Sequence, residues 1–116
     1  ASCVGHDSHN ILVVGTDEQS ICRSVNLVIE QAGGISAVCG DVEEVMPRPI
    51  AVIMTAADGD TTAAEYQRLD AFAKEKLGST LTAPFMTLSV MALLVIPSLK
   101  LSDRGLFDSQ SFRFAQ

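Results

Sequence analysis

The stretch Gly5-His6-Asp7-Ser8-His9-Asn10-Ile11-Leu12-Val13-Val14-Gly15 changes abruptly from polar to aliphatic. Its aliphatic half, 11–14, has the pattern of a central buried strand that ends at a glycine. Its polar half contains both histidines of the chain, three positions apart, and indicates a loop at the edge of that strand. Loops held by rigid elements are where binding and catalytic groups concentrate. The segment 6–10 is therefore the candidate functional loop.

The same residues also have a purely structural explanation. Asp, Ser and Asn side chains hydrogen-bond to nearby backbone, and glycine permits tight turns. On residue chemistry alone these roles are the more frequent ones, because short motifs often match by chance. A metal site formed by His6 and His9 with Asp7 is a third interpretation, but its ligand set is incomplete.

The residues next to this stretch predict a strand on one side and a helix on the other. A short strand at 2–4 leads into the loop. After Gly15, Thr16 is a helix N-cap with Gln19 as its capping-box partner, and Gly33-Gly34 ends the helix. The buried face of this helix is predicted from apolar side chains at helical spacing: Ile21, Cys22, Val25, Val28, Ile29 and Ala32.

A hairpin is predicted next, with strands at 35–39 and 42–46 around a Gly40-Asp41 turn. Prolines block its continuation, and 49–54 predicts a further strand or a short buried segment.

Two more helices follow. One begins near 60–62, with Thr62 and Glu65 as a capping box, and ends at Gly78. Its buried face comprises Tyr66, Leu69, Phe72 or Ala73, and Leu77. A short apolar helix at 85–91 follows Pro84, with the Thr87 and Ser89 hydroxyls bonded back to its own backbone.

An edge strand at 99–101, a turn at 103–105 and a tail at 106–114 complete the chain. Three aromatic residues anchor the tail: Phe107, Phe112 and Phe114. The whole order predicts a single α+β domain spanning 1–116, with a small mixed or antiparallel sheet covered on one side by helices.

Composition excludes several classes of function. Of the 116 residues, 47% are hydrophobic, which is enough for a core. The net charge of -6 and the scattered lysines and arginines argue against nucleic acid as a partner. The most apolar stretch, 90–96, is far shorter than the roughly 20 residues of a membrane span, and the polar first ten residues argue against a signal peptide. No membrane partner is expected.

The three cysteines are Cys3, Cys22 and Cys39. Their odd number and the lack of a Cys-x-x-Cys spacing fit neither a disulfide framework nor a zinc ribbon. We expect unpaired thiols, at least two of them buried, with Cys22 on the buried face of its helix and Cys39 at a strand end. Reduced thiols indicate a cytoplasmic protein.

Several longer motifs carry a resemblance to a known family. The segment SCVGHDSHNILVVG at 2–15 resembles the opening of the C-terminal domain of prokaryotic-type adenine deaminases. PFMTLS at 84–89 and VIPSLKLSDRGL at 95–106 resemble its closing segment. NLVIEQAGGI at 26–35 and PRPIA at 47–51 occur between them in the family's order. Two places depart from the pattern: Leu94 stands where the family usually has proline, and 54–60 departs more.

The resemblance implies an amidohydrolase-type enzyme that hydrolyses adenine to hypoxanthine and ammonia. In that family a dinuclear manganese or iron centre in a (β/α)-barrel activates the attacking hydroxide. Such a barrel takes about 250 residues, so this chain resembles only the non-barrel C-terminal domain. The alternative zinc site of nucleobase deaminases, His-x-Glu with Pro-Cys-x-x-Cys, is absent from the sequence. No cofactor is expected in this chain, and we expect it to be inactive alone.

The resemblance also suggests roles for the loop 6–10. His6 or His9 would shuttle a proton to the departing ammonia, and three polar residues would bind adenine: Asp7, Ser8 and Asn10. The expected partners are adenine and the barrel domain of the same polypeptide, and the chain could also form a homo-oligomer. The competing hypothesis is a structural or oligomerisation domain that never contacts substrate.

Overall fold

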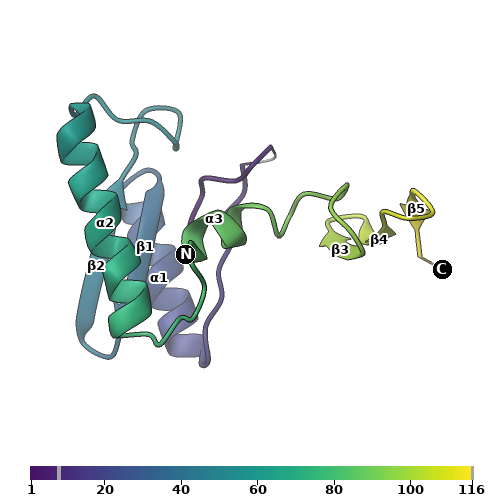
Figure 1. Cartoon of the computed structure of the whole chain (residues 1–116), viewed down its shortest axis with the longest axis horizontal. Helices are drawn as coiled ribbons and strands as arrows, with labels where there is room; N and C mark the ends of the chain where they lie inside the picture. Colours follow the sequence, from purple (N-terminus) through teal and green to yellow (C-terminus); the bar gives the residue numbers. More distant parts are fainter. Residues whose placement is uncertain (8, 116) are drawn as a thin grey trace.

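The computed structural model describes residues 1–7 and 9–115 and has an α+β architecture, as predicted (Figure 1). The elements in chain order are α1 (Glu18–Glu30), β1 (Gly34–Cys39), β2 (Val42–Pro47), α2 (Gly59–Glu75), α3 (Pro84–Ser89), β3 (Leu99–Ser102), β4 (Gly105–Asp108) and β5 (Arg113–Phe114). They form two small antiparallel sheets, β1–β2 and β3–β4–β5. None of the described helices is long and apolar enough to cross a membrane.

The β1–β2 hairpin is confirmed, but it is packed between two helices and not covered on one side only (Figure 1). Successive side chains of a strand point to opposite faces, and β1 is buried on both. Ser36 faces α1, where its hydroxyl donates to the Ser24 carbonyl at 2.7 Å. Ile35 and Ala37 face α2 and pack with Leu69 in the core. The sequence predicted helices on one side only, because a small residue such as Ser36 on the α1 face gives no apolar signal.

Helix α1 begins one residue later than predicted and buries only part of the predicted face: Val28 is buried, and Ile21 and Val25 are half-buried. Asp17 is the N-cap, with its carboxylate accepting from the Ser20 amide at 2.8 Å. The buried side chains are those of Ser24, Leu27 and Val28. Cys22, Ile29 and Ala32 are exposed, and this part of the prediction was wrong. The close approach of Ser36 to Ser24 turns this side of the helix toward the hairpin.

The predicted central strand at 11–14 is also wrong. Leu12 makes one antiparallel bridge, to Ser2, and Val14 is 79% exposed. The first residues of the chain pair with β1 instead, since Ser2 bridges to Ile35 as well as to Leu12. A short apolar run shows that a segment favours burial, but not which strand pairs with it.

The segment 49–54 forms an exposed turn and not a strand. An antiparallel bridge joins Ile50 to Met54, and Ala51 and Val52 have φ values of 51° and 63°. Positive φ is unusual for a β-branched residue such as Val52. This turn lies against the end of α1, through contacts described below.

Helices α2 and α3 occur where predicted, with different ends. Asp58 caps α2 by accepting from the Thr61 amide at 3.0 Å, so Thr62 is not the cap. On its buried face Leu69, Phe72 and Ala73 are buried, Tyr66 is half-buried and Leu77 is exposed. Helix α3 ends at Ser89, with only Phe85 and Ser89 buried, because it covers one end of the core and is not surrounded. The hydroxyls of Thr87 and Ser89 do bond back to its backbone, as predicted.

The C-terminal sheet β3–β5 stands apart from the other helices and strands of the described chain (Figure 1). The expected edge strand at 99–101 is present as β3, but the expected tail forms two further strands. Phe107 is buried because Phe112 and Phe114 pack edge-on against it, with ring centroids 5.4 and 5.3 Å away. Phe112 itself is 70% exposed, so it shields Phe107 without being an anchor in a core.

The cysteines are free thiols, but only Cys3 is buried. Cys39 is half-buried and Cys22 is exposed, so the expectation of at least two buried thiols was wrong. The error for Cys22 arises because only part of the predicted face of α1 is buried.

Candidate functional site

The candidate loop is held at both ends by backbone hydrogen bonds beside β1. Ser2 and Leu12 exchange two of them, each 2.8 Å long. Cys3 donates to the Gly34 carbonyl at 3.0 Å, which fixes the first stem of the loop to β1. The loop therefore leaves from and returns to a rigid part of the domain. The sequence predicts a loop held in this way, although the segment that anchors it to β1 is 1–3 and not 11–14.

Two further contacts shape the loop itself. The Gly5 amide donates to Nδ1 of His9 at 3.1 Å, and the His6 amide donates to the Ser89 carbonyl at 3.0 Å. The first contact ties the two halves of the loop together. The second attaches the loop to the C-terminal end of α3. Ser89 had no place in the sequence prediction of the site, because it acts through its carbonyl, which every residue has.

The loop exposes the side chains of four of the five predicted site residues. His6, Asp7, His9 and Asn10 are exposed, and Ser8 lies outside the described residues. His9 has its Nδ1 occupied by the Gly5 amide, so in the neutral ring the proton is on Nε2. The structure thus brings two imidazoles, a carboxylate and an amide onto one short accessible segment.

A cavity of about 460 Å³ lies beside the second half of this loop. His9 and Asn10 contribute polar side chains to it, and the rest of the lining is mainly apolar: Cys3, Ile11, Val28, Ile29, Ala32, Gly33 and Val52. Ligand sites typically combine apolar walls with a few polar groups that orient the ligand. The position of this cavity makes the loop and the end of α1 one continuous surface feature.

The wall of this cavity depends on a close backbone contact at Gly33. A Cβ atom on Gly33 would lie 2.4 Å from the Cα of Val52, and Gly33 has a φ of +126°. Cys3 braces the same turn, with its Sγ 2.8 Å from the Val52 carbonyl oxygen and accepting from the Gly34 amide at 2.9 Å. The sequence signals this feature only through the paired glycines, which the prediction used as a helix stop.

The described residues do not provide a metal site. Across 1–7 and 9–115, no three His, Cys, Asp or Glu side chains gather in a way that could hold a metal ion. The dinuclear centre implied by the sequence resemblance therefore does not fit this part of the chain. The chemistry available in the loop is hydrogen bonding and proton exchange.

Comparison with known proteins identifies the family. Residues 1–113 match the family described as the adenine deaminase C-terminal domain. The chain is 54% identical over 114 residues to the adenine deaminase of Sulfurovum sp. and 50% identical over 114 residues to that of Salinibacter ruber. It is 47% identical over 112 residues to that of Methanothermobacter thermautotrophicus.

The matches cover 97–98% of this chain but only 21% of each of these relatives, so the chain spans about a fifth of their length. No solved structure matches. The agreement extends over nearly the whole chain, including the loop and the cavity beside it. The chain belongs to the family of adenine deaminase C-terminal domains.

Proposed function

We propose that the complete protein is an adenine deaminase and that this domain completes its adenine pocket with the loop 6–10. In the reaction, water adds oxygen to the amino-bearing carbon of adenine, the carbon–nitrogen bond breaks, and the amino group takes up a proton and leaves as ammonia. The names of the relatives support the activity. The observation that carries the role of this domain is the exposure of His6, Asp7, His9 and Asn10 on a loop held at both ends. Polar groups that served only an internal network would be buried.

The loop offers the groups that an adenine edge requires. Adenine presents an amino donor beside ring-nitrogen acceptors, and a site that pairs with both rejects analogues that lack them. Asp7 can accept from the amino group, and Ser8 and Asn10 can both donate and accept. His6 or His9 can pass a proton to the leaving amino group, since an imidazole can both accept and donate one. For His9, whose Nδ1 accepts from Gly5, Nε2 is the nitrogen that would do so.

Activation of water is assigned to the rest of the polypeptide. A dinuclear manganese or iron centre in the barrel domain would supply the metal-bound hydroxide. The described residues of this domain do not form its ligand set. The domain alone should therefore produce no hypoxanthine from adenine, even with added manganese or iron. Measurable product from the purified fragment would contradict this assignment.

The decisive experiment uses the full-length enzyme with three separate variants: His6→Ala, Asp7→Ala and His9→Ala. Loss of a general acid or base lowers turnover roughly 10²–10⁴-fold, whereas loss of a structural bond lowers the thermal midpoint. We expect lower turnover in all three variants, with thermal midpoints nearly unchanged for His6→Ala and Asp7→Ala and slightly lower for His9→Ala, which also loses the bond from Gly5. If all three variants melt early but turn over normally at low temperature, the loop is structural.

A second candidate function is oligomerisation, and the C-terminal sheet favours it. One face of this sheet presents Leu99, Leu101 and Leu106, which are 50%, 75% and 39% exposed. Exposed aliphatic side chains gathered on one sheet face are typical of an interface. Leu101→Asp in the full-length enzyme should shift the mass measured by light scattering toward the monomer if this face joins two copies. An unchanged mass would remove this candidate.

We also assign the protein to the cytoplasm. The support is chemical: the described chain holds three free thiols, and that of Cys22 is exposed. Such thiols persist in a reducing compartment.

A further inference from the structure

The edge of β1 that faces away from β2 is paired along only part of its length. Ser36 and Ala1 exchange two backbone hydrogen bonds, each 2.8 Å long, and Cys3 donates to the Gly34 carbonyl at 3.0 Å. Ala1 therefore lies directly opposite Ser36 in an antiparallel pairing. Going back along the chain from Ala1, the direction of this pairing leads toward Val38 and the tip of the hairpin.

Val38 is the next position on the same edge. Its N–H and C=O point the same way as those of Ser36, because backbone groups alternate sides along a strand. Within residues 1–7 and 9–115 no backbone group pairs with Val38 from that side. An unpaired strand edge is a template for another strand.

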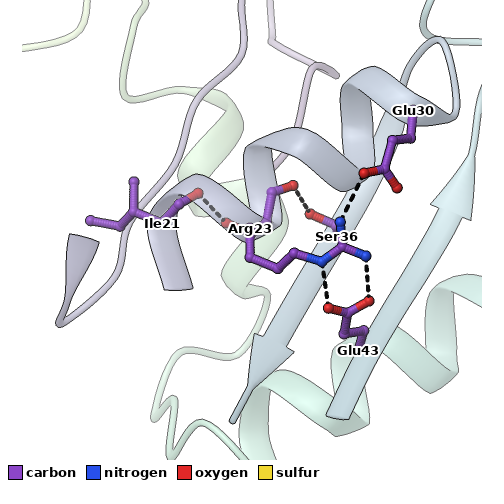
Figure 2. Close-up of polar contacts among 6 residues, drawn as sticks. Ile21, Arg23, Glu30, Ser36 and Glu43 are labelled. Carbon is purple, nitrogen blue, oxygen red and sulfur yellow. Dashed lines mark hydrogen bonds and ion pairs between the residues drawn. The ribbon is translucent and has the colours of Figure 1, made fainter. Parts of the chain in front are cut away.

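A groove opens between α1 and the tip of the hairpin, on the face where the Val38 side chain lies. It has a volume of about 570 Å³ and is lined by Val38, Gly40, Asp41 and Glu43 of the hairpin and by Gln19, Ser20, Cys22, Arg23 and Asn26 at the start of α1. Figure 2 shows Arg23 reaching from α1 to Glu43, where two guanidinium nitrogens donate to the two carboxylate oxygens. The hydrogen bonds from Arg23 lower the pKa of the Glu43 carboxyl. A charged pair in the lining of the groove therefore joins α1 to β2.

The family provides a segment that could occupy this edge of β1. The family matches are to a C-terminal domain that makes up 21% of the relatives, so other residues precede the matching segment in those proteins.

We propose that, in the complete protein, the residues immediately before Ala1 continue as a β-strand along β1 and pair with Val38, next to the groove at the hairpin tip. The register follows from the pairing of Ala1 with Ser36. The second residue before Ala1 pairs with Val38, and its side chain lies on the α1 face with that of Ser36. The residue immediately before Ala1 lies opposite Ala37, on the α2 face. This proposal rests on family membership and not on the roles assigned to the loop.

Hydrogen exchange in the unmodified full-length protein tests the pairing. We compare the Val38 amide with that of Val45, whose N–H points outward at the opposite edge of the same hairpin. The Val38 amide is expected to exchange at least about tenfold more slowly, since it gains a backbone acceptor. Equal exchange at the two positions overturns the proposal, whether both are fast or both are shielded.

A disulfide cross-link tests the register. Ala37→Cys is combined with a cysteine at the residue immediately before Ala1, in a background in which Cys22 and Cys39 are replaced by serine. Opposed residues that do not bond to each other lie about 4.5 Å apart at Cα, a separation that a disulfide can span. The matched control moves the new cysteine to the second residue before Ala1, on the other face. The proposal expects the first pair to form a disulfide and the control to stay reduced; a folded protein that shows the reverse, or no cross-link, refutes it.

Discussion

The backbone amide of Gly5 donates to Nδ1 of His9 at 3.1 Å, across the candidate loop. This contact determines the tautomer of the neutral ring and leaves Nε2 as its exposed, proton-bearing nitrogen. One hydrogen bond thus shapes the loop and also selects the atom that can exchange a proton with a ligand.

The two contributions of His9 can be separated by substitution. The amide oxygen of an asparagine can take the place of Nδ1, so His9→Asn should keep the bond from Gly5, whereas His9→Ala loses it. Both variants should lose turnover in the full-length enzyme, roughly 10²–10⁴-fold if His9 moves the proton. Only His9→Ala should also lower the free energy of unfolding, by about 0.5–1.5 kcal/mol. Turnover rescued by asparagine would show that the bond to Gly5 matters and the ring does not.

The contact between Gly33 and Val52 predicts an unusually costly glycine substitution. Gly33→Ala would place a Cβ 2.4 Å from the Val52 Cα at a φ of +126°, so the strained backbone and the overlap should together cost about 2–5 kcal/mol in unfolding free energy. Gly40→Ala is the matched control, because Gly40 also has positive φ, +59°, but has nothing within 4 Å of the new Cβ. Its expected cost is about 1–2 kcal/mol. Urea unfolding of both variants measures the difference, and equal midpoints would refute the contact.

Thiol labelling should follow the exposure of the three cysteines. Cys22 should react first and Cys3 last, because Cys22 is exposed and Cys3 is buried, with its Sγ bonded to backbone groups of Gly34 and Val52. The measurement is site-resolved mass spectrometry after short exposure of the native protein to a thiol reagent. All three should react equally fast in urea, which serves as the control. Fast native labelling of Cys3 would contradict the packing of the turn at 49–54.

Acid should destabilise the two long helices through their N-caps. The Ser20 amide lowers the pKa of Asp17, and the Thr61 amide lowers the pKa of Asp58, both from an ordinary value of 3.8. A carboxyl whose pKa is lower in the folded state stabilises the fold above its ordinary pKa, and this stabilisation is lost as pH falls through the folded value. Helical circular dichroism should therefore decrease below about pH 4.

The matched variant for this acid effect carries Asp17→Asn and Asp58→Asn. Asparagine still accepts the capping hydrogen bond but does not titrate in this range. The double variant should show a weaker loss of helix between pH 4 and pH 2. The same acid profile in both proteins would assign the effect to other carboxyls.

The sequence predicts the helices and strands of this domain better than it predicts which of them pack or pair together. The hairpin and the two long helices are signalled locally, by turn residues, proline and glycine stops, and apolar spacing. The segment that pairs with β1 is not signalled locally. The stretch 11–14 has the stronger apolar pattern, but 1–3 makes the backbone hydrogen bonds to β1. Thr16 and Asp17 are both chemically suitable N-caps, so the choice between them depends on how the chain enters the helix.

For the site, the sequence indicates the polar loop itself but not what surrounds it. His6, Asp7, His9 and Asn10 do lie together on an exposed loop. The turn at Val52 and the carbonyl of Ser89 contribute through backbone atoms, which no side-chain pattern reveals. The roles of the loop residues in catalysis stay predictions.

The pairing of Ser2 with both Leu12 and Ile35 has a consequence for how such proteins can diverge. These pairings fix the register of the backbone on either side of the loop. They do not depend on the length of the loop between Ser2 and Leu12. Doubling the length of a flexible loop costs only about 0.6 kcal/mol in closure entropy. Insertions between Gly5 and Ile11 therefore leave these pairings in place, so the loop can change in length while the scaffold keeps its register.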